Sequence, residues 1–187
     1  SSRRRGRPRA PGPRAAAARQ RHHYAHADAT GLDRRTSLLD ALGRPHDRLR
    51  PVFHVAGTNG KGSTCAFLRA GLEAAGHRVH VFTSPHLVRY NERIRLAGTL
   101  ISDEQLADVM ARVLDANDAV GGSLFEVNTA AALLAFADTP ADAVVLEVGL
   151  GGRLDATNVI ERQVACGIAS IGLDHQRNFR VFTLPEP

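Results

Sequence analysis

Residues 51–76 carry the pattern that most constrains the fold of this chain. The run PVFHVAG is short, apolar and ends in glycine, which predicts a buried β-strand. The later stretch GSTCAFLRAGLEAAGH predicts a helix ending at Gly76, with apolar side chains at helical spacing: Phe67, Leu68, Leu72 and Ala75. A strand, a glycine-rich loop and a helix in this order can cradle phosphate, because loop N–H groups and the positive end of the helix dipole point at the same anion.

The loop between this strand and helix holds Lys61, the only lysine of the chain. A glycine stands on either side of it, so no adjacent side chain packs against its ammonium group, and we expect the charge to serve an anion. Lys61 could reach the β- and γ-phosphates of a nucleotide, and Ser63 or Thr64 could ligate Mg²⁺. The strict pattern G-x-x-x-x-G-K-[ST] is not met, since Val55 occupies the first glycine position and a glycine follows the lysine. An ordinary glycine-rich turn is the alternative.

The remainder of the chain alternates predicted strands and helices. Strands are predicted at 78–84, 142–149 and 163–172, a strand or hairpin arm at 90–98, and helices at 36–43, 102–117 and 125–138. We expect Thr36 or Ser37 to cap the first of these helices, Ser102 to cap the second with Gln105 completing a capping box, and the third to be buried on one side. The alternation predicts an α/β fold with a P-loop-type, mostly parallel sheet flanked by helices.

Polar residues follow the predicted strands where each of them ends. They are Gly57 to Ser63, Thr83 to His86, Glu147 to Asp155, and Asp174 with His175. Right-handed crossovers bring the carboxyl ends of parallel strands to one edge of a sheet, so these groups should meet at a common rim. Glu147 closes the apolar VVLEV run, and a buried carboxylate must be paired or metal-bound because burying it bare is costly.

Structural roles compete with functional ones for several of these residues. Ser84 could cap a turn before proline, Glu147 could belong to a structural ion pair, and Arg153 could pair with Asp155 to stabilise their loop. We assign structural roles to three histidines in or beside strands: His54, His77 and His80. Another triplet could shape the loop after the second strand: Asn91, Glu92 and Arg93.

The positive charge of the chain is unevenly distributed. Its pI is near 10.2, yet residues 1–27 contain eight arginines and no acid, which leaves the rest mildly acidic and without a basic stripe. Nucleic-acid binding by the folded part is therefore not expected. Residues 1–29 are predicted to be a disordered Arg/Ala/Pro-rich extension, with a transit peptide or a basic nucleic-acid arm as alternatives.

Membrane insertion and disulfide chemistry are not expected either. No apolar run approaches the ~18 residues needed to span a bilayer. The two cysteines, Cys65 and Cys166, lie in apolar segments without metal-ligand spacing, and no signal-peptide core is visible. We predict a reducing, cytoplasmic location.

Five blocks of the sequence carry a resemblance to a known family: HVAGTNGKGSTCAFL, FTSPHLVRYNERIRL, FEVNTAAALLAF, LEVGLGGRLDATNVI and GLDHQ. In this order and spacing they resemble the folylpolyglutamate synthase/dihydrofolate synthase family of the Mur ligase superfamily. GTNGK is the Mur-ligase form of the phosphate loop, which accounts for the failed strict pattern, while TSPHL with NERI, and GGRLDATN, are typical of the folate branch. The likeness runs from about Gly31 to Gln176.

The resemblance implies an ATP-dependent ligase that adds L-glutamate to dihydropteroate or a (tetrahydro)folate. In this family the folate-side carboxylate attacks the γ-phosphate of ATP to give an acyl phosphate, and the glutamate amine then displaces phosphate. ATP and Mg²⁺ are the implied cofactors. A carboxylate has to approach a polyanion, so cations must be fixed at that place beforehand.

The resemblance also implies roles for individual residues. ATP phosphates would be bound by Thr58, Asn59, Gly60, Lys61, Gly62 and Ser63. Divalent metal would be held by Ser63, Ser84, Glu147 and His175, with Lys61, Glu147 and His175 acting in catalysis. The pterin part of the substrate would lie against Thr30, Gly31, Leu32, Ser123, Leu124, Phe125, Glu126 and Leu154. Mg²⁺ seldom takes an imidazole ligand, so the role of His175 rests on the resemblance alone.

The sequence departs from the family pattern after GLDHQ. It reads RNFRVFTLPEP and lacks a second lysine, whereas the family continues with a segment whose lysine supports the second metal. We therefore interpret 30–176 as the N-terminal part of an incomplete Mur-ligase ATP-binding domain and 177–187 as a non-family tail. We expect the 187-residue chain to be weakly active or inactive alone, and the full-length protein to be a monomer.

Other functions fit the sequence less well. A different P-loop ATP-binding protein, such as a small-molecule kinase, would need the strict loop and lid arginines, and neither is visible. A peptidoglycan Mur ligase would favour threonine after Lys61 and would lack GGRLDATN. A non-catalytic fragment, or a nucleic-acid binder acting through residues 1–27, completes the alternatives.

Overall fold

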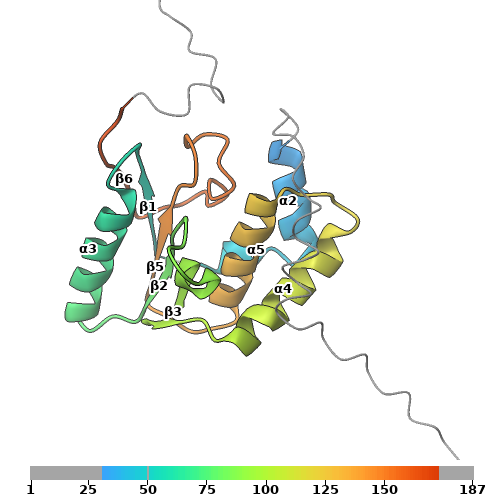
Figure 1. Ribbon diagram of the computed structural model, residues 1–187, viewed down its shortest axis with the longest axis horizontal. Coiled ribbons are helices and arrows are strands. Elements are labelled where there is room, and N and C mark those ends of the chain that lie inside the picture. Colours follow the sequence, from blue (N-terminus) through green and yellow to red (C-terminus); the bar gives the residue numbers. More distant parts are fainter. Residues whose placement is uncertain (1–30, 50, 173–187) are drawn as a thin grey trace, which may run out of the picture.

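The computed structural model describes residues 31–49 and 51–172, with side chains from Arg35 onward (Figure 1). Predictions for residues 1–29, Thr30, Asp174, His175 and 177–187 lie outside these residues. In chain order the elements are α2 (Gly31–Ala41), η2 (Pro45–Arg48), β1 (Val52–Ala56), α3 (Lys61–Ala74), β2 (Val79–Phe82), η3 (Tyr90–Arg93), β3 (Ile94–Leu96), β4 (Thr99–Leu100), α4 (Asp103–Asn117), α5 (Leu124–Ala137), β5 (Ala143–Glu147) and β6 (Ala165–Ile168).

The six strands form one sheet in the order β4-β3-β2-β5-β1-β6. β2, β5, β1 and β6 run parallel to one another, while β3 and β4 form a hairpin that joins β2 antiparallel at one edge. β5 is central, as its continuous apolar run requires, and all five of its residues are buried. The predicted mostly parallel α/β sheet is confirmed.

The helices divide between the two faces of the sheet. α3 covers one face, where Cys65, Leu68 and Leu72 pack with alternate valines of the strands. α2, α4 and α5 cover the other, where the larger apolar cluster lies, and Figure 1 shows them opposite α3. Alternation along the strands produces both clusters: Val145 belongs to the first, while Val144 and Leu146 belong to the second.

Helix α5 is more deeply buried than the sequence predicts. Its residues from Glu126 to Phe136 are all buried, so the expectation of burial on one side is wrong. The helix lies between the sheet and the pair α2 and α4, so it contacts apolar neighbours all round, and its alanines allow this close approach.

Two local predictions are also wrong. The helix predicted at 36–43 begins at Gly31, so Thr36 and Ser37 lie within α2 and do not cap it. Phe67 does not face the sheet; it is 79% exposed, because Cys65, Leu68 and Leu72 define the inner face of α3. The capping box of Ser102 with Gln105 at the start of α4 is confirmed.

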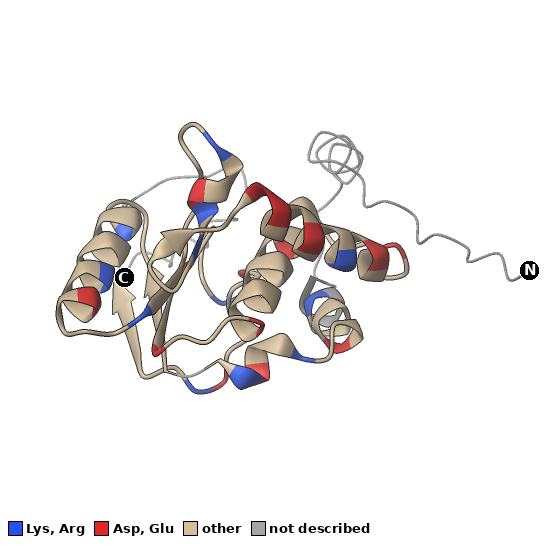
Figure 2. Ribbon diagram, turned by 90° about the horizontal axis from the view of Figure 1, so that it is seen from below, with Lys and Arg blue, Asp and Glu red and all other residues tan. Residues whose placement is uncertain are grey.

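Basic and acidic residues are interspersed over the described part (Figure 2). Many of them pair locally: Arg44 bridges Asp40 and Asp47, and Arg112 bridges Asp108 and Asp138. These pairs are at least a third exposed, so each contributes little to stability. No helix in the described part is long and apolar enough to cross a membrane.

Candidate active site at the carboxyl edge of the sheet

The loop between β1 and α3 lies at the carboxyl edge of the sheet. Gly57 and Gly60 have φ values of +135° and +81°, a region that favours glycine, and Gly60 is the N-cap residue that precedes α3. The loop is fixed to the segment after β6: the N–H groups of Thr58 and Asn59 both donate to the carbonyl of Ser170, at 2.8 and 3.3 Å. The predicted phosphate-binding residues 58–63 thus form a short, pinned turn leading into a helix N-terminus.

Lys61 folds back over this turn. Its Nζ donates to the carbonyl oxygens of Gly57 at 3.0 Å and Thr58 at 3.2 Å, which holds the ammonium group beside the loop. The hydroxyl of Thr64 donates to the carbonyl of Gly60 at 2.9 Å, whereas Ser63 is exposed in the first turn of α3. Of the two hydroxyls considered for a metal, that of Thr64 is therefore the one engaged with the backbone of this turn.

Glu147 stands at the end of β5 and is only 4% exposed. Its Oε2 accepts a hydrogen bond from the backbone N–H of Ser84, which follows β2, at 3.2 Å. A Cβ added to Gly62 would lie 3.9 Å from the same oxygen, so the carboxylate adjoins the first turn of α3. Burial raises the pKa of Glu147, and the Ser84 N–H and the Lys61 charge oppose that rise.

The structural-ion-pair alternative for Glu147 finds no support in the described residues. None of their salt bridges includes this carboxylate. They also contain no cluster of three His, Cys, Asp or Glu side chains able to hold a metal. What the structure does bring together is one buried carboxylate, the Ser84 backbone and the lysine loop, from the ends of three neighbouring strands.

The loop that carries Ser84 is shaped from within. Glu92 accepts hydrogen bonds from the N–H groups of residues 87, 88 and 89, and these bonds lower its pKa. Arg93 donates from Nε to Nδ1 of His86 at 2.8 Å, and the buried Asn91 donates to the carbonyl of Ile101. Asn91, Glu92 and Arg93 thus shape this loop, while its predicted contact with substrate stays a prediction.

Half of the eight residues predicted to contact the pterin lie around the first turn of α5. Ser123 caps this helix and Glu126 completes a capping box, with the Ser123 N–H donating to Glu126 Oε2 at 2.6 Å. The ring of Phe125, next to Leu124, covers Gly149, where any Cβ would overlap it. The structure thus joins residues 123–126 to the loop after β5, which also carries the 61%-exposed Leu154.

The other predicted pterin contacts are at the start of the described chain. Gly31 and Leu32 form the first residues of α2, whose inner side packs on α4 and α5. Arg35, one turn further along α2, is buried and donates to the carbonyl of Asp155. Arg35 was not singled out by the sequence, because a lone arginine in a helix carries no motif.

The predicted pair of Arg153 with Asp155 is wrong. Arg153 is exposed, whereas the carboxylate of Asp155 is 5% exposed and accepts hydrogen bonds from its own loop. His54 and His80 have structural partners as predicted: His54 Nε2 lies 2.8 Å from Thr157 Oγ1, and His80 Nε2 lies 2.9 Å from the carbonyl of Thr139. Burial lowers the pKa of both histidines.

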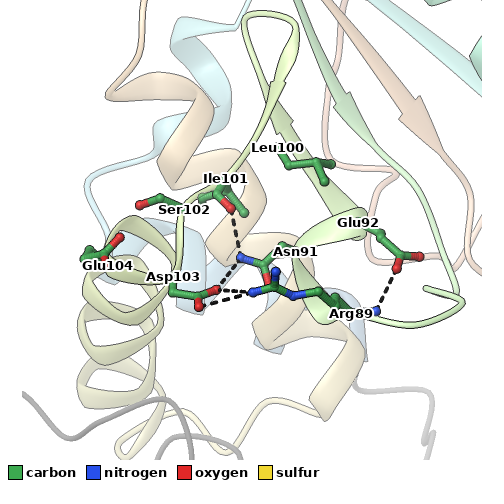
Figure 3. Close-up of a pocket in the computed structure, with 8 residues that line it drawn as sticks. All are labelled: Arg89, Asn91, Glu92, Leu100, Ile101, Ser102, Asp103 and Glu104. Carbon is green, nitrogen blue, oxygen red and sulfur yellow. Dashed lines mark hydrogen bonds and ion pairs between the residues drawn. The ribbon is translucent and has the colours of Figure 1, made fainter.

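A separate hollow of about 340 Å³ lies between the β3–β4 hairpin and α4 (Figure 3). Arg89 and Asp103 pair across it, and Asn91 donates to Asp103 at 2.9 Å. It contains none of the predicted ATP, metal or pterin residues. We therefore place the candidate site at the rim formed by β1, β2 and β5.

Comparison with known proteins identifies relatives of this chain. No family model matches it. The dihydrofolate synthase/folylpolyglutamate synthase of Bacillus subtilis is 45% identical over 152 residues, which are 78% of this chain and 35% of that protein. The chain therefore spans about a third of the length of this relative.

Solved structures agree with this finding. The Escherichia coli enzyme in complex with DHPP and ADP has a TM-score of 0.80 and 39% identity, over 91% of this chain and 41% of its own. A bifunctional folylpolyglutamate synthase/dihydrofolate synthase with Mn, AMPPNP and L-glutamate bound has a TM-score of 0.81 and 41% identity, over 90% of this chain and 40% of its own. The chain belongs to the folylpolyglutamate synthase/dihydrofolate synthase family.

Proposed function

We propose that this chain contributes the phosphate- and pterin-binding part of an ATP-dependent ligase that adds L-glutamate to dihydropteroate or a folate. The carrying observation is the meeting of Glu147, Ser84 and the Lys61 loop at one rim of the sheet. Relatives with ADP, AMPPNP, DHPP and L-glutamate bound support the substrate classes.

The reaction requires two anions to be brought together. The substrate carboxylate attacks the γ-phosphorus of ATP, the bond from that phosphorus to the β–γ bridging oxygen breaks, and ADP leaves. The glutamate amine then attacks the acyl carbon and phosphate leaves. We propose that Lys61 and the N–H groups of the first turn of α3 supply positive potential to the phosphates, and that the exposed Ser63 contacts them.

The residues at the rim fit a divalent metal. Among the described residues, the Ser84 N–H is the one hydrogen-bond donor to the buried Glu147 carboxylate, and the neighbouring Lys61 donates to loop carbonyls instead. Such a carboxylate is stabilised by a hard cation, for which carboxylate and hydroxyl oxygens are the preferred ligands. We propose that Glu147, Ser84 and Ser63 hold Mg²⁺, with His175 as a further ligand; the ion would neutralise phosphate charge during transfer.

The pterin end of the substrate is proposed to lie between α2, the first turn of α5 and the loop after β5. Phe125 and Leu154 offer apolar surface there, and Gly31 and Leu32 are the first residues of α2. Thr30, the remaining proposed contact, lies outside the described residues. Because the chain covers only about a third of its relatives, we propose that the remaining groups for adenine and glutamate lie on residues outside it.

We also propose a cytoplasmic location and a monomeric full-length protein. Both cysteines are free, Cys65 buried and Cys166 exposed, which suits a reducing compartment. Burial beside Glu147 raises the pKa of Cys65 to about 12, so its thiol is unreactive.

Magnesium-ATP binding to the 187-residue chain tests the proposal. We expect Lys61→Ala to weaken binding about 10- to 100-fold, since a charge-assisted contact contributes about 1.5–3 kcal/mol. Arg69→Ala is the matched control, because it removes a cation two turns further along the same helix, and it should bind as the parent does. Equal affinity of the parent and Lys61→Ala would refute the proposed nucleotide site.

A further inference from the structure

A chain of buried hydrogen bonds connects β1 to the loop after β5. His54, in the middle of β1, lies with Nε2 2.8 Å from the hydroxyl of Thr157, and that hydroxyl donates to Oδ1 of Asp155 at 2.5 Å. The three residues are 7%, 0% and 5% exposed, respectively. They come from segments about a hundred positions apart in sequence, so the contact is a property of the fold.

The direction of these hydrogen bonds can be assigned. A hydroxyl has one proton, and that of Thr157 is used in the bond to the Asp155 carboxylate. The hydroxyl oxygen must therefore accept from His54, which requires the proton of the neutral imidazole to be on Nε2. Valine at position 157 would leave this buried N–H without its acceptor, whereas serine would keep it.

Asp155 fixes the loop at both of its ends. Its Oδ2 accepts from the N–H of Leu150 at 2.8 Å, its Oδ1 also accepts from the N–H of Thr157 at 2.9 Å, and its carbonyl accepts from Arg35 of α2. Three hydrogen bonds therefore engage both oxygens of this carboxylate inside the protein. Residues 150–157 are consequently closed into a loop tied to β1 and α2.

This loop touches each segment proposed to bind the pterin. Gly149, just before it, packs under the ring of Phe125 in the first turn of α5. Arg35 lies one turn beyond Gly31 and Leu32 on α2, and Leu154 is part of the loop itself. Displacement of the loop would therefore separate the proposed pterin contacts from one another, while the phosphate loop is held independently by Ser170.

We propose that His54 and Thr157 are positioning residues for the pteroate substrate: acting through Asp155, they hold the loop 150–157 where α2, α5 and Leu154 can contact one ligand. The inference rests on the proposed function, because it takes the pteroate as the ligand of that site. Neither residue is expected to touch substrate, nucleotide or metal.

The test compares three forms of the full 187-residue chain: the parent, Thr157→Val and Thr157→Ser. Their dissociation constants for dihydropteroate and for magnesium-ATP are measured by calorimetry. We expect Thr157→Val to bind dihydropteroate about tenfold more weakly, Thr157→Ser to recover the affinity of the parent, and all three to bind magnesium-ATP within about twofold of one another. A general structural defect would weaken both ligands, and that result would overturn the inference, as would unchanged dihydropteroate binding by Thr157→Val.

Limited trypsin digestion gives a second readout that needs no ligand. Arg153 is exposed within the loop, while Arg89 lies on the separate loop after β2 and provides an internal reference site. We expect cleavage after Arg153, relative to Arg89, to accelerate at least severalfold in Thr157→Val and not in Thr157→Ser. If the parent itself fails to bind dihydropteroate, the proposed substrate is wrong, and the digestion still decides whether His54 and Thr157 position the loop: equal cleavage ratios would refute that role.

Discussion

Replacement of Glu147 by glutamine should stabilise the metal-free chain. The side chain is 4% exposed; among the described residues it accepts one hydrogen bond, at 3.2 Å, and has no salt-bridge partner. The effective cost of burying such a carboxylate is several kcal/mol, and a hydrogen bond to a charged group returns about 1.5–3 kcal/mol. Glutamine has the same size and keeps an oxygen for the Ser84 N–H, so it removes the charge without making a cavity.

The difference leaves an expected gain of about 1–2 kcal/mol in the free energy of unfolding for Glu147→Gln. For a chain of this length that corresponds to a rise in Tm of about 2–8 °C. Urea unfolding is measured in EDTA and again in excess Mg²⁺ with ATP. Mg²⁺ with ATP should raise the free energy of unfolding of the parent, by an amount that increases with the ratio of ligand concentration to Kd. The variant should gain much less.

Two results would refute this reasoning. If Glu147→Gln is less stable than the parent in EDTA, groups within the protein already offset the desolvation cost of the Glu147 carboxylate. Its burial would then give no reason to infer a bound cation. If Mg²⁺ with ATP stabilises both forms equally, Glu147 is not part of the metal site. Lys61→Ala provides a comparison, because it should lose ligand stabilisation without the gain in EDTA.

Two further outcomes are expected from the described geometry. Gly149→Ala should destabilise the fold by about 1–3 kcal/mol, because the new methyl group overlaps the Phe125 ring. The double variant Gly149→Ala with Phe125→Leu should lose less stability than the sum of the two single variants, because the smaller side chain makes room for the methyl group. Strictly additive losses of stability, measured by thermal unfolding, would contradict the contact. The free energy of unfolding should fall as the pH decreases below about 6.5. Burial lowers the pKa of His46, His54 and His80 in the folded chain, so the unfolded chain takes up protons that the folded chain does not. Equal free energies of unfolding at about pH 7.5 and 5.5 would contradict this.

The element order and the common rim could be predicted because they depend on local patterns. Apolar runs ending in glycine located β1 and β5, and the rule that parallel strands end at one edge placed Glu147 near the phosphate loop before any coordinates. The capping box at Ser102 was found from the same spacing that also exists at Ser123 and Glu126. The sequence analysis assigns Ser123 and Glu126 to the substrate and does not predict their capping box.

Contacts between distant segments could not be predicted. The partners His54 and Thr157 are 103 positions apart, and Arg35 and Asp155 are 120 apart, so no window of sequence contains either pair. The prediction for Phe67 is wrong for a different reason. Adjacent residues on a helix are rotated by about 100°, so when Leu68 faces the sheet, Phe67 must face solvent or lie at the edge of the buried face. The spacing alone did not decide which of two adjacent apolar residues faces the sheet.

The register of β1 against β5 sets both halves of the candidate site. Val55, two residues before Gly57, pairs with Glu147, so β1 sets the position of the carboxylate relative to the phosphate loop. His54 of the same strand pairs with Leu146 and places the imidazole that reaches Thr157. A slip of one residue would turn His54 to the α3 face and shift Glu147 relative to the loop. Hydrophobic alternation on both faces, with Val144 and Leu146 on one side and Val145 on the other, opposes such a slip. The packing that stabilises the sheet therefore also holds the phosphate loop and the pterin-side loop at a fixed separation.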